Sequence, residues 1–505
     1  MTQCIILTGG IQGNTDSPRV QRSLGPYRIA TALEQAGYTT FVLDYIINFT
    51  VEEIKQALQA HLGPDTLWVG FSGTFFWKMY SGSKNTKDEM YYTDNKSEIA
   101  EIFEFVHANS NAKMVYGGGG AHFHLVDNRI DFYVVGYADN TAIALTNYLM
   151  HNDINYLTHY EKITVSGEER ILIDSKKYPE PKMNELVTSF QNVMPNEGLP
   201  IELARGCIFK CKFCNYPLIG KKKGTYIRDV EQVREELIEH YEKFGTTNYY
   251  FTDDTFNDDN DKIEALHRVF TSLPFKPQFS CYLRVDLIHA FPHQADLLTE
   301  MGLIGTYFGL ETMQPKSATA IGKGLHPNKV KERLYWLDEK WHNKVNIGAG
   351  FILGLPYDTR DYFKEIYNWC REKDNPLDSI DFYPLHLYSR KDKNKELLSS
   401  YSSEFSLNHE IYGYEFLEDH ISWSLKDTDL NYQEVGQIAS WYRGIMARRN
   451  KYAEFRMINA LNAGIELTDL YSCTIDEITK KYDVPKLCEN KFVEYKKIVG
   501  AIKRD

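Results

Sequence analysis

Residues 207–214 read Cys-Ile-Phe-Lys-Cys-Lys-Phe-Cys, so three of the chain's eight cysteines fall within one short segment. Cys207, Cys211 and Cys214 are spaced four and then three residues apart. Three thiolates this close in sequence can hold a metal ion or a polynuclear centre. A structural zinc site, however, usually takes four protein ligands, and an iron–sulfur cluster that only transfers electrons normally takes four cysteines.

No second cysteine pair lies near this triplet. Cys281 and Cys370 are isolated, and no histidine separates Cys473 from Cys488 near the end of the chain. If the triplet holds a cubane of four irons, one iron has no protein ligand and is open to a substrate or cofactor. We therefore interpret the triplet as a catalytic cluster site. The alternative is that three thiols share a loop by chance.

The segments that surround the triplet predict a series of strands and helices from residue 196 to residue 390. Short apolar segments alternate there with helical patterns such as residues 229–245. Six such units indicate an open or partial (β/α)6 TIM barrel, whose chemistry is expected at the carboxyl ends of its strands. The six strand segments read PIELARG, TNYYFTDDTF, PQFSCYLRVD, GTYFGLET, VNIGAGFILGLP and DSIDFYPLHLY.

Residues 1–150 predict a separate α/β domain. Strand-like runs alternate with helical patterns, which indicates a Rossmann-like parallel sheet wound on both faces. One helix is expected to begin after Thr50, with Glu53 completing a capping box. Ligands of such folds bind beyond the carboxyl ends of the strands. Glycines at these ends allow close backbone approach to a ligand, but they are also ordinary turn residues; they occur in Gly9-Gly10, Ser72-Gly73, Gly117–Gly120 and Gly136.

Two further regions complete the chain. Residues 151–195 are expected to form a hairpin around Ser166-Gly167, followed by a linker that contains prolines. Beyond residue 391 the strand pattern fades, so residues 391–505 are predicted to form an α-helical region.

The cysteine triplet, with Phe213 directly before its third cysteine, resembles the Cys-x3-Cys-x2-Cys signature of the radical S-adenosylmethionine (SAM) superfamily. The resemblance implies that Cys207, Cys211 and Cys214 ligate a [4Fe-4S] cluster and that Phe213 lies near the adenine of SAM. The open iron would chelate the amino and carboxylate groups of SAM, and reduction would cleave SAM to methionine and a 5′-deoxyadenosyl radical. The resemblance also implies an electron donor such as flavodoxin or ferredoxin.

Residues at the ends of the later strands fit the same resemblance over roughly residues 200–390. Asp253 and Asp254 follow the second strand, where members of the superfamily place groups near the methionine moiety. Arg284 ends the third strand, Glu311 the fourth and Gly354 the fifth. The resemblance implies that these residues contact the cofactor, although each alone also fits a solvated turn or a surface ion pair.

The first 150 residues resemble the cobalamin-binding domain that precedes the barrel in one large class of radical SAM enzymes. The resemblance rests on segments such as SLGPYRIATALEQAGY and KMVYGGGGAH. An Asp-x-His-x-x-Gly motif with a cobalt-ligating histidine is absent, as is common in that class, and GYADN replaces a more acidic pattern. His122 and His124 are alternative axial ligands, and a degenerate domain without cobalamin stays open. The corrin ring and its nucleotide tail would be cradled by Ser72, Gly73, Gly117 and Gly118.

The whole chain has 505 residues, 43% of them hydrophobic, and a formal net charge of −12. Its length predicts two or three domains, and its charge argues against an extensive nucleic-acid-binding surface. No apolar run approaches the ~20 residues that cross a bilayer, and the start of the chain lacks a signal-peptide pattern. The sparse use of cysteine indicates a cytoplasmic setting. The substrate expected is a small molecule, a peptide or a nucleotide.

We therefore expect a radical SAM enzyme that activates an unreactive C–H bond, with cobalamin-dependent methyl transfer as the leading hypothesis. One alternative is a cobalamin-independent rearrangement or cyclisation enzyme whose first domain is structural or holds the substrate. Another is a non-catalytic cluster-binding protein. The related methylthiotransferases are set aside because they need a second cluster on three cysteines in the N-terminal domain, which here holds only Cys4.

Overall fold

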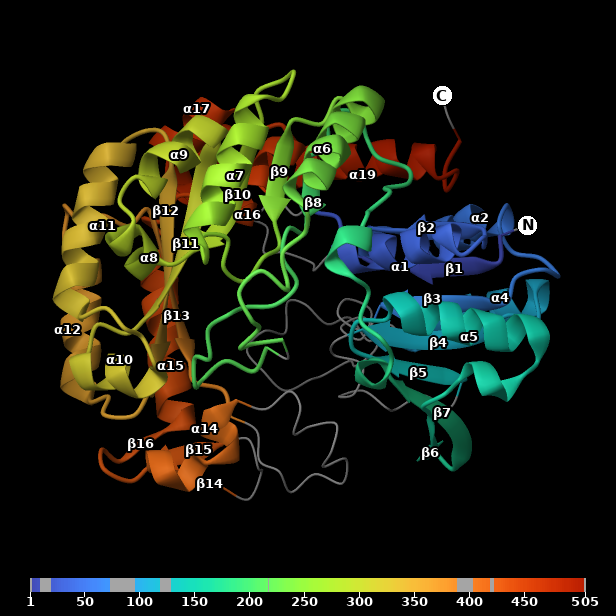
Figure 1. Cartoon of the computed structure of the whole chain (residues 1–505), viewed down its shortest axis with the longest axis horizontal. Coiled ribbons are helices and arrows are strands. Elements are labelled where there is room, and N and C mark those ends of the chain that lie inside the picture. The colour runs from blue at the N-terminus through green and yellow to red at the C-terminus, as the bar shows by residue number, and fades with distance from the viewer. Residues whose placement is uncertain are drawn as a thin grey trace. The chain divides into compact units, whose positions relative to one another are not determined.

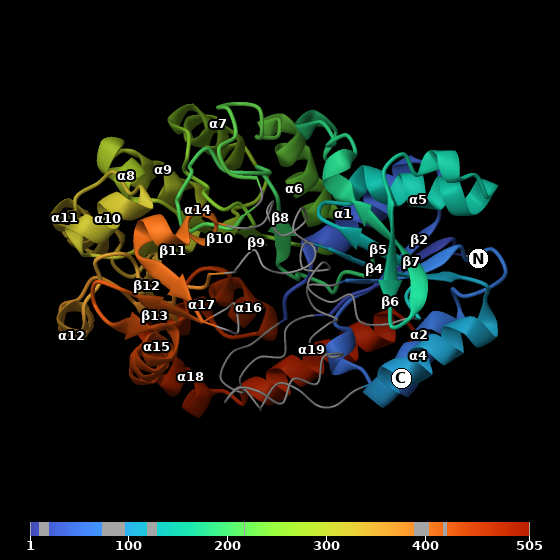
Figure 2. The same ribbon diagram turned by 90° about the horizontal axis from the view of Figure 1, so that it is seen from below.

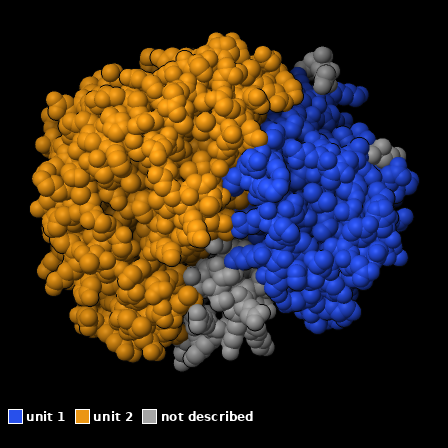
Figure 3. All heavy atoms as spheres, in the orientation of Figure 1, with its two compact units in different colours: residues 1–197, 485–505 blue, residues 198–484 orange. Residues whose placement is uncertain are grey.

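The computed structural model describes residues 2–9, 20–72, 96–118, 129–216, 218–387, 403–417 and 422–503. The chain divides into two compact units (Figure 3). Unit 1 comprises Met1–Glu197 and Pro485–Asp505, and unit 2 comprises Gly198–Val484. Among the described residues, no helix is long and apolar enough to cross a membrane.

Unit 1 is built on a seven-stranded sheet in the order β2-β1-β3-β4-β5-β7-β6 (Figure 1). Every neighbouring pair is parallel except β6 with β7. The order reverses at β1, which has β2 on one side and β3 on the other, and such a reversal creates a ligand-binding crevice in open sheets. The strands are β1 (Cys4–Leu7), β2 (Thr40–Leu43), β3 (Trp68–Ser72), β4 (Lys113–Gly118), β5 (Phe132–Val135), β6 (Glu161–Val165) and β7 (Glu168–Asp174).

Helices cover both faces of this sheet, as the sequence predicts. Helices α1 (Leu24–Gln35) and α5 (Asp139–His151) pack together on one face, and α2 (Val51–Gln59) and α4 (Lys96–Asn109) pack on the other (Figure 2). The capping box expected at Thr50 and Glu53 is present at the start of α2. Short 3-10 helices occupy Ile46–Asn48, Ile154–Tyr156, Ser175–Lys177 and Met183–Glu185.

Two parts of unit 1 differ from the expected division at residues 150 and 195. The predicted hairpin around Ser166 forms, but its strands continue the sheet because β7 pairs with β5. The C-terminal helix α19 (Val484–Ile498) also belongs here: the Asp44 N–H donates to the Tyr495 hydroxyl at 3.0 Å, and Lys496 lies 2.7 Å from Glu53. Such long-range pairings are not encoded in local periodicity.

Unit 2 contains a six-stranded parallel sheet in which every strand pairs with the next one in the chain, in the order β8 to β13. Right-handed crossovers with this sequential order place the connecting helices on one face, as in a partial (β/α) barrel. The strands are β8 (Leu199–Ile201), β9 (Asn248–Phe251), β10 (Gln278–Leu283), β11 (Leu303–Glu311), β12 (Asn346–Leu353) and β13 (Ser379–Pro384). The connecting helices are α6 (Val230–Phe244), α7 (Asn260–Thr271), α8 (Val285–Ala290), α9 (Gln294–Met301), α10 (Pro315–Ile321), α11 (Pro327–Trp341) and α12 (Arg360–Cys370).

A late helix, α16 (Phe455–Ala463), packs against β9, β10 and β11. A Cβ at Gly305 would lie 2.9 Å from Met457, so the absence of a side chain lets α16 approach β11 closely. Since side chains alternate along a strand, Gly305 shares its face with Tyr307 and Gly309. Helix α16 therefore fills the amino-terminal part of this face and leaves its carboxyl-terminal part for the pocket described below.

Beyond β13 the chain is not purely helical, which corrects the expectation for residues 391–505. Three short antiparallel strands form a separate sheet: β14 (Tyr414–Phe416), β15 (Trp423–Leu425) and β16 (Leu430–Asn431). Strands of two or three residues contain too few alternations to produce a recognisable period. The helices of this region are α14 (Glu404–Leu407), the 3-10 helix His409–Tyr412, α15 (Tyr432–Met446), α17 (Leu467–Ser472) and α18 (Ile475–Lys481).

A buried ion pair joins Arg22, which precedes α1, to Glu197, the last residue of the N-terminal part of unit 1. Arg22 Nε and Nη2 donate to the two carboxylate oxygens of Glu197 at 2.8 and 2.9 Å, and both side chains are at most 1% exposed. The Tyr45 hydroxyl donates to the same carboxylate at 2.6 Å, and Arg22 Nη2 donates to the Asn192 carbonyl at 2.7 Å. Each charge is compensated only as long as its partner is present.

Replacement of Arg22 by Met should destabilise unit 1 by roughly 3–5 kcal/mol, because Glu197 is left as a buried, uncompensated charge. Urea unfolding followed by circular dichroism measures this loss. The matched control is Lys162→Met, which breaks the ion pair with Glu169, whose side chains are 61% and 65% exposed. The control should change stability by less than about 1 kcal/mol, and equal losses in both variants would contradict the assignment.

Gly354 follows β12 with a φ of +89°, and a Cβ there would collide with the Trp423 indole. The Trp423 side chain is fully buried and donates from Nε1 to the Leu385 carbonyl at 2.8 Å. The Gly354 N–H donates to Asp358 Oδ2 at 3.0 Å. Gly354 therefore allows the chain after β12 to pass directly beneath β15.

Replacement of Gly354 by Ala should destabilise unit 2 by about 2 kcal/mol or more, through left-handed backbone strain and the clash with Trp423. The control is Gly444→Ala in α15, where a Cβ would meet nothing within 4 Å. Alanine in a helix interior should stabilise by roughly 0.5–1 kcal/mol relative to glycine. Thermal unfolding of both variants measures the contrast, and an unchanged Gly354→Ala variant would contradict this packing role.

Candidate active site at the carboxyl ends of strands β8 to β13

The cysteine triplet lies on a loop that follows β8 and is held by backbone hydrogen bonds. The Cys207 N–H donates to the Leu218 carbonyl at 3.0 Å, and the Lys221 N–H donates back to the Cys207 carbonyl at 3.0 Å. Gly206 has a φ of +121°, and a Cβ there would lie 2.8 Å from the Leu218 carbonyl oxygen. The glycine before the first cysteine is therefore required by this close approach.

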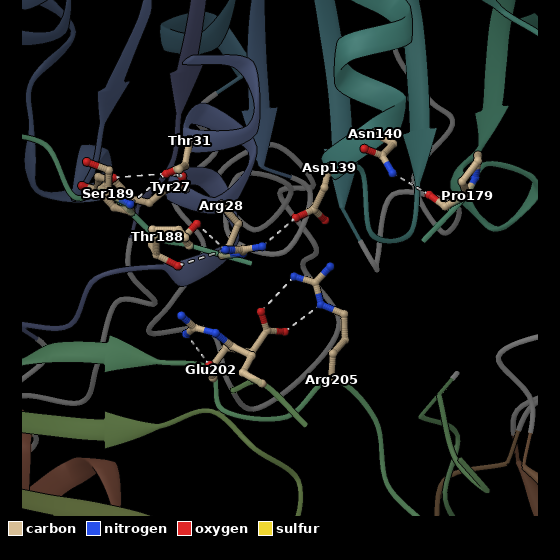
Figure 4. Close-up of polar contacts among 12 residues, drawn as sticks. Tyr27, Arg28, Thr31, Asp139, Asn140, Pro179, Thr188, Ser189, Glu202 and Arg205 are labelled. Atoms are coloured by element: carbon tan, nitrogen blue, oxygen red, sulfur yellow. Dashed lines mark hydrogen bonds and ion pairs between the residues drawn. The ribbon is translucent and has the colours of Figure 1, made fainter. Parts of the chain in front are cut away.

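Neighbouring segments also hold the loop. The Lys212 N–H donates to the Ile321 carbonyl at 3.2 Å at the end of α10. Before the loop, Arg205 donates twice to Glu202, at 2.8 and 2.9 Å, and both residues are buried (Figure 4). The loop is thus a folded part of unit 2.

The three cysteines line a pocket of about 480 Å³ at the carboxyl ends of the strands. Every strand or the segment that follows it contributes to the lining, as expected for a parallel barrel-like sheet. Of the residues that the sequence suggests for this unit, the pocket brings together Cys207, Cys211, Phe213, Cys214, Asp254, Arg284 and Glu311.

Among the described residues, no three Cys, His, Asp or Glu side chains are arranged to hold a single metal ion. A cubane cluster imposes a different requirement, because each thiolate then ligates its own iron atom. Burial raises the pKa of Cys207 and raises that of Cys214 to about 11. Both are therefore thiols at neutral pH until a metal displaces their protons. The donor set fits a polynuclear centre better than a mononuclear zinc site.

Arg284 connects the end of β10 to the cysteine loop. Its Nη1 donates to Cys211 Sγ at 3.6 Å, and its guanidinium lies 3.7 Å from the centroid of the Phe209 ring. Asp286 accepts from Nε and Nη2 at 3.0 and 2.6 Å. Burial acts to raise the pKa of Asp286, but the Arg284 guanidinium outweighs it and the net pKa is lowered. Arg284 therefore places a fixed positive charge beside the second cysteine.

Glu311 ends β11 in a strained conformation that directs it to the pocket. Its φ is +65°, and the pairing of β11 with β12 shifts register between Gly309 and Glu311. Such a bulge re-aims side chains at a strand end. Lys323 donates to the Gly309 carbonyl at 2.7 Å and lies 3.9 Å from Glu311. Burial raises the pKa of Glu311, and Lys323 and Arg284 oppose part of this shift.

The two aspartates after β9 separate in the structure. Asp254 lines the pocket; burial raises its pKa to about 6, and a hydrogen bond from Tyr216 opposes this shift. Asp253 is absent from the lining, because its Oδ2 accepts the Leu203 N–H at 3.1 Å. Burial raises the pKa of Asp253 to about 7, and Lys262 opposes this shift. Asp253 thus tethers the chain after β8.

Gly354 is also absent from the lining. Gly350 and Ile352, which precede it on β12, line the pocket instead. A Cβ at Gly350 would collide with the Tyr307 ring, so this glycine makes room for an aromatic residue of the neighbouring strand. The structure therefore places Gly354 in the packing against Trp423 described above.

Several lining residues were missed at the sequence level. Tyr282 and Tyr307 come from adjacent strands and lie 5.8 Å apart between ring centroids. The sequence could have revealed them, because alternate side chains of a strand share a face. Tyr282 precedes Arg284 by two residues, and Tyr307 precedes Glu311 by four. Lys323 and His386 carry no such signal, because they lie beyond the strands.

In unit 1, Ser72 ends β3 and pairs in register with Gly117 of β4. Gly118, the last residue of β4, has a φ of +123°. These residues therefore share the carboxyl edge of the sheet. Gly73, His122 and His124 lie outside the described residues.

The loop GYADN after β5 places Asp139 at the start of α5. Arg28 Nη2 donates to Asp139 at 3.3 Å, and both residues are buried (Figure 4). Arg28 also donates to the Val187 carbonyl and to Thr188. Asp139 thus forms an internal ion pair that holds the segment near residue 188 against α1.

Comparison with known proteins shows which proteins this chain resembles in sequence and in fold. Residues 201–370 match the model of a protein family that is described as "Radical SAM superfamily". The methyltransferase PH0819 of Pyrococcus horikoshii, itself described as uncharacterized, is 30% identical over 190 residues, which cover 35% of this chain and 38% of that protein. The chain thus spans well under half the length of this curated relative.

Solved structures share the fold over a larger part of the chain. The radical SAM methyltransferase TsrM from Kitasatospora setae, with tryptophan and a SAM analog bound, has a TM-score of 0.62 and 15% identity; the match covers 95% of this chain and 99% of that chain. The cobalamin-dependent SAM radical enzyme OxsB has a TM-score of 0.55 and 15% identity, covering 83% of this chain and 56% of that chain. The family match is thus confined to residues 201–370 of unit 2, while the solved structures share the fold over most of the chain.

Proposed function

We propose that this protein is a radical SAM enzyme that transfers a methyl group to an unreactive carbon of a small substrate with the help of cobalamin. The observation that carries the proposal is the convergence of three cysteines, an arginine and two carboxylates on one pocket at the strand ends. The relatives support it: PH0819 is described as a methyltransferase, and a TsrM structure contains cobalamin and a [4Fe-4S] cluster.

Cys207, Cys211 and Cys214, which line the pocket, would hold a [4Fe-4S] cluster, one iron of which would have no protein ligand. The cluster, once reduced in the presence of SAM, supplies reductive cleavage of the sulfonium and a 5′-deoxyadenosyl radical. Arg284 would stabilise the thiolate of Cys211 electrostatically and limit the conformations of the loop through Phe209. An electron donor such as flavodoxin or ferredoxin would provide the reducing equivalent.

The remaining charged groups fit the ammonium and carboxylate groups on the methionine part of SAM. Asp254 and Glu311 offer carboxylates to an ammonium group, and Lys323 offers an ammonium to a carboxylate. Phe213 and Ile352 provide apolar surface beside these groups. The tyrosines of β10 and β11 would help to exclude water, which protects a reactive intermediate from quenching.

The carboxyl edge of the sheet in unit 1 would bind cobalamin. Ser72 and Gly117 are neighbours at this edge, next to the point where the strand order reverses. The missing side chains at Gly117 and Gly118 would allow a large planar ring to approach the backbone. A cobalamin-free enzyme with a structural first domain is the alternative, and cobalt content separates the two.

Replacement of Cys211 by Ala should abolish formation of 5′-deoxyadenosine from SAM by anaerobically reconstituted, dithionite-reduced protein, because the cluster loses one of its three thiolate ligands. Chromatographic quantification of 5′-deoxyadenosine, together with the iron content per chain, measures the effect. The control is Cys473→Ala, a half-exposed cysteine outside the pocket, which should behave as wild type. Undiminished product from Cys211→Ala would refute the ligand assignment.

Protein purified anaerobically with added cobalamin should retain cobalt, and Gly117→Phe should reduce that cobalt to a small fraction of the wild-type value. A phenyl group would occupy the space into which the ring is proposed to approach. Gly117→Ala is the control, since its Cβ would meet Val134 at no less than 3.4 Å. Inductively coupled plasma mass spectrometry reports the cobalt-to-protein ratio. Wild-type protein without cobalt would favour the cobalamin-independent alternative.

A further inference from the structure

The pocket has one wall that lies outside the segment shared with the superfamily. The matched segment ends at residue 370, and it supplies the cysteines, Arg284 and Glu311. The second wall comes from β13 and the residues that follow it: Tyr383, Pro384, Leu385 and His386. Because the common chemistry is carried by the shared segment, contacts particular to this chain's substrate are expected on the second wall.

Helix α15 packs along β13 and brings the side chains of Tyr432 and Arg443 beside this wall. His386 Nδ1 and the Tyr432 hydroxyl are 3.0 Å apart and share a hydrogen bond. The Arg443 guanidinium lies 5.4 Å from the centroid of the Tyr383 ring. Of these residues, Tyr383 and His386 line the pocket. Tyr432 and Arg443 lie behind them and reach the β13 side of the pocket through these two contacts.

Arg443, an exposed arginine, has no counter-ion among the described residues, unlike Arg284 and Arg456. Arg284 is paired with Asp286, and Arg456 is paired with both Asp381 and Glu454. Arg443 forms no ion pair and no side-chain hydrogen bond with any residue in the described part of the chain. A guanidinium presents a rigid fork of donors that matches carboxylate and phosphate oxygens.

The surroundings of His386 suit the same kind of ligand. Burial and the charge of Arg443 lower the pKa of His386. With Nδ1 engaged by Tyr432, the other ring nitrogen, Nε2, is available to a ligand. The nearby carboxylates of Asp381 and Glu454 are both ion-paired with Arg456, and neither is paired with Arg443.

We propose that Arg443, His386 and Tyr432 form a subsite for an anionic group of the substrate, a carboxylate or a phosphate, at the β13 side of the pocket. The subsite rests on the proposed function, since it names the class of substrate that this pocket accepts. Arg443 supplies the charge, and the Tyr383 ring beneath it limits the orientations of the guanidinium. Arg284 is paired with Asp286, and Lys323 is the residue proposed above for the carboxylate of SAM, so neither duplicates this role.

Isothermal titration calorimetry of the full-length protein at low ionic strength tests the subsite with three probes of similar shape: benzoate, phenyl phosphate and the neutral benzamide. Wild-type protein should bind at least one of the two anions about tenfold or more tightly than benzamide, because a charged pair outweighs a neutral hydrogen bond. The tighter of the two anions identifies a carboxylate or a phosphate as the favoured group.

Arg443→Gln should weaken binding of that anion about tenfold or more and leave benzamide unchanged, while Arg443→Lys should restore part of the affinity. The matched control is Arg448→Gln, which removes an exposed arginine just beyond α15, leaves the Arg443–Tyr383 contact in place and should match wild type. Arg443 is itself exposed, so its variants should keep the wild-type unfolding midpoint, which is checked in parallel.

Three outcomes would overturn the subsite: anions that bind no tighter than benzamide, an Arg443→Gln variant with wild-type affinity, or equal losses in the Arg443 and Arg448 variants. The titration needs neither a cluster nor turnover. If the titration contradicts the subsite, the 5′-deoxyadenosine assay still tests the proposed function. If that assay contradicts the proposed function, the measured anion affinities are unaffected.

Discussion

The parallel pairing of β8 to β13 is the constraint on which the candidate site depends. In a sheet of this kind all strands end at the same edge, so residues from distant parts of the chain meet there. Cys207, Asp254, Arg284, Glu311 and His386 span almost two hundred residues of sequence, yet all of them line one pocket. The strand interiors of this unit provide the rigid frame, and the loops at their ends provide the chemistry.

Because many charged side chains meet at this pocket, most of them are paired with a group of opposite charge or with a hydrogen-bonding partner. Arg284 faces both Asp286 and Cys211, and Lys323 lies between Glu311 and a backbone carbonyl. Buried ionisable groups are tolerated only when such partners are present. The same rule holds in unit 1, where Arg22 with Glu197 and Arg28 with Asp139 connect the segment before residue 198 to the sheet. Arg443, by contrast, is exposed to solvent and needs no such partner, which leaves its guanidinium available to a ligand.

Close backbone approach explains most of the glycines that matter for the pocket. Gly206 lets the cysteine loop fold back on Leu218, Gly350 accommodates the Tyr307 ring, and Gly305 admits Met457 of α16. These glycines lie in segments that sequence patterns identify correctly as strands or turns. Their role as spacers is visible only once the neighbouring residue is known, because that neighbour comes from another strand or from the end of the chain.

The amino-acid sequence alone determined the alternation of strands and helices in both α/β units, the capping box at Thr50, the hairpin at Ser166 and the position of the cysteine triplet after the first strand of unit 2. These features are local: they follow from periodicity, capping residues and the spacing of like side chains. Tertiary structure alone decided that Asp254 lines the pocket while Asp253 holds a backbone amide, and that Gly354 packs on Trp423. It also decided that α19 joins unit 1 and that Tyr432 and Arg443 reach β13. The physical reason is that these outcomes depend on which distant surfaces are complementary, and no property of a short sequence window records that complementarity.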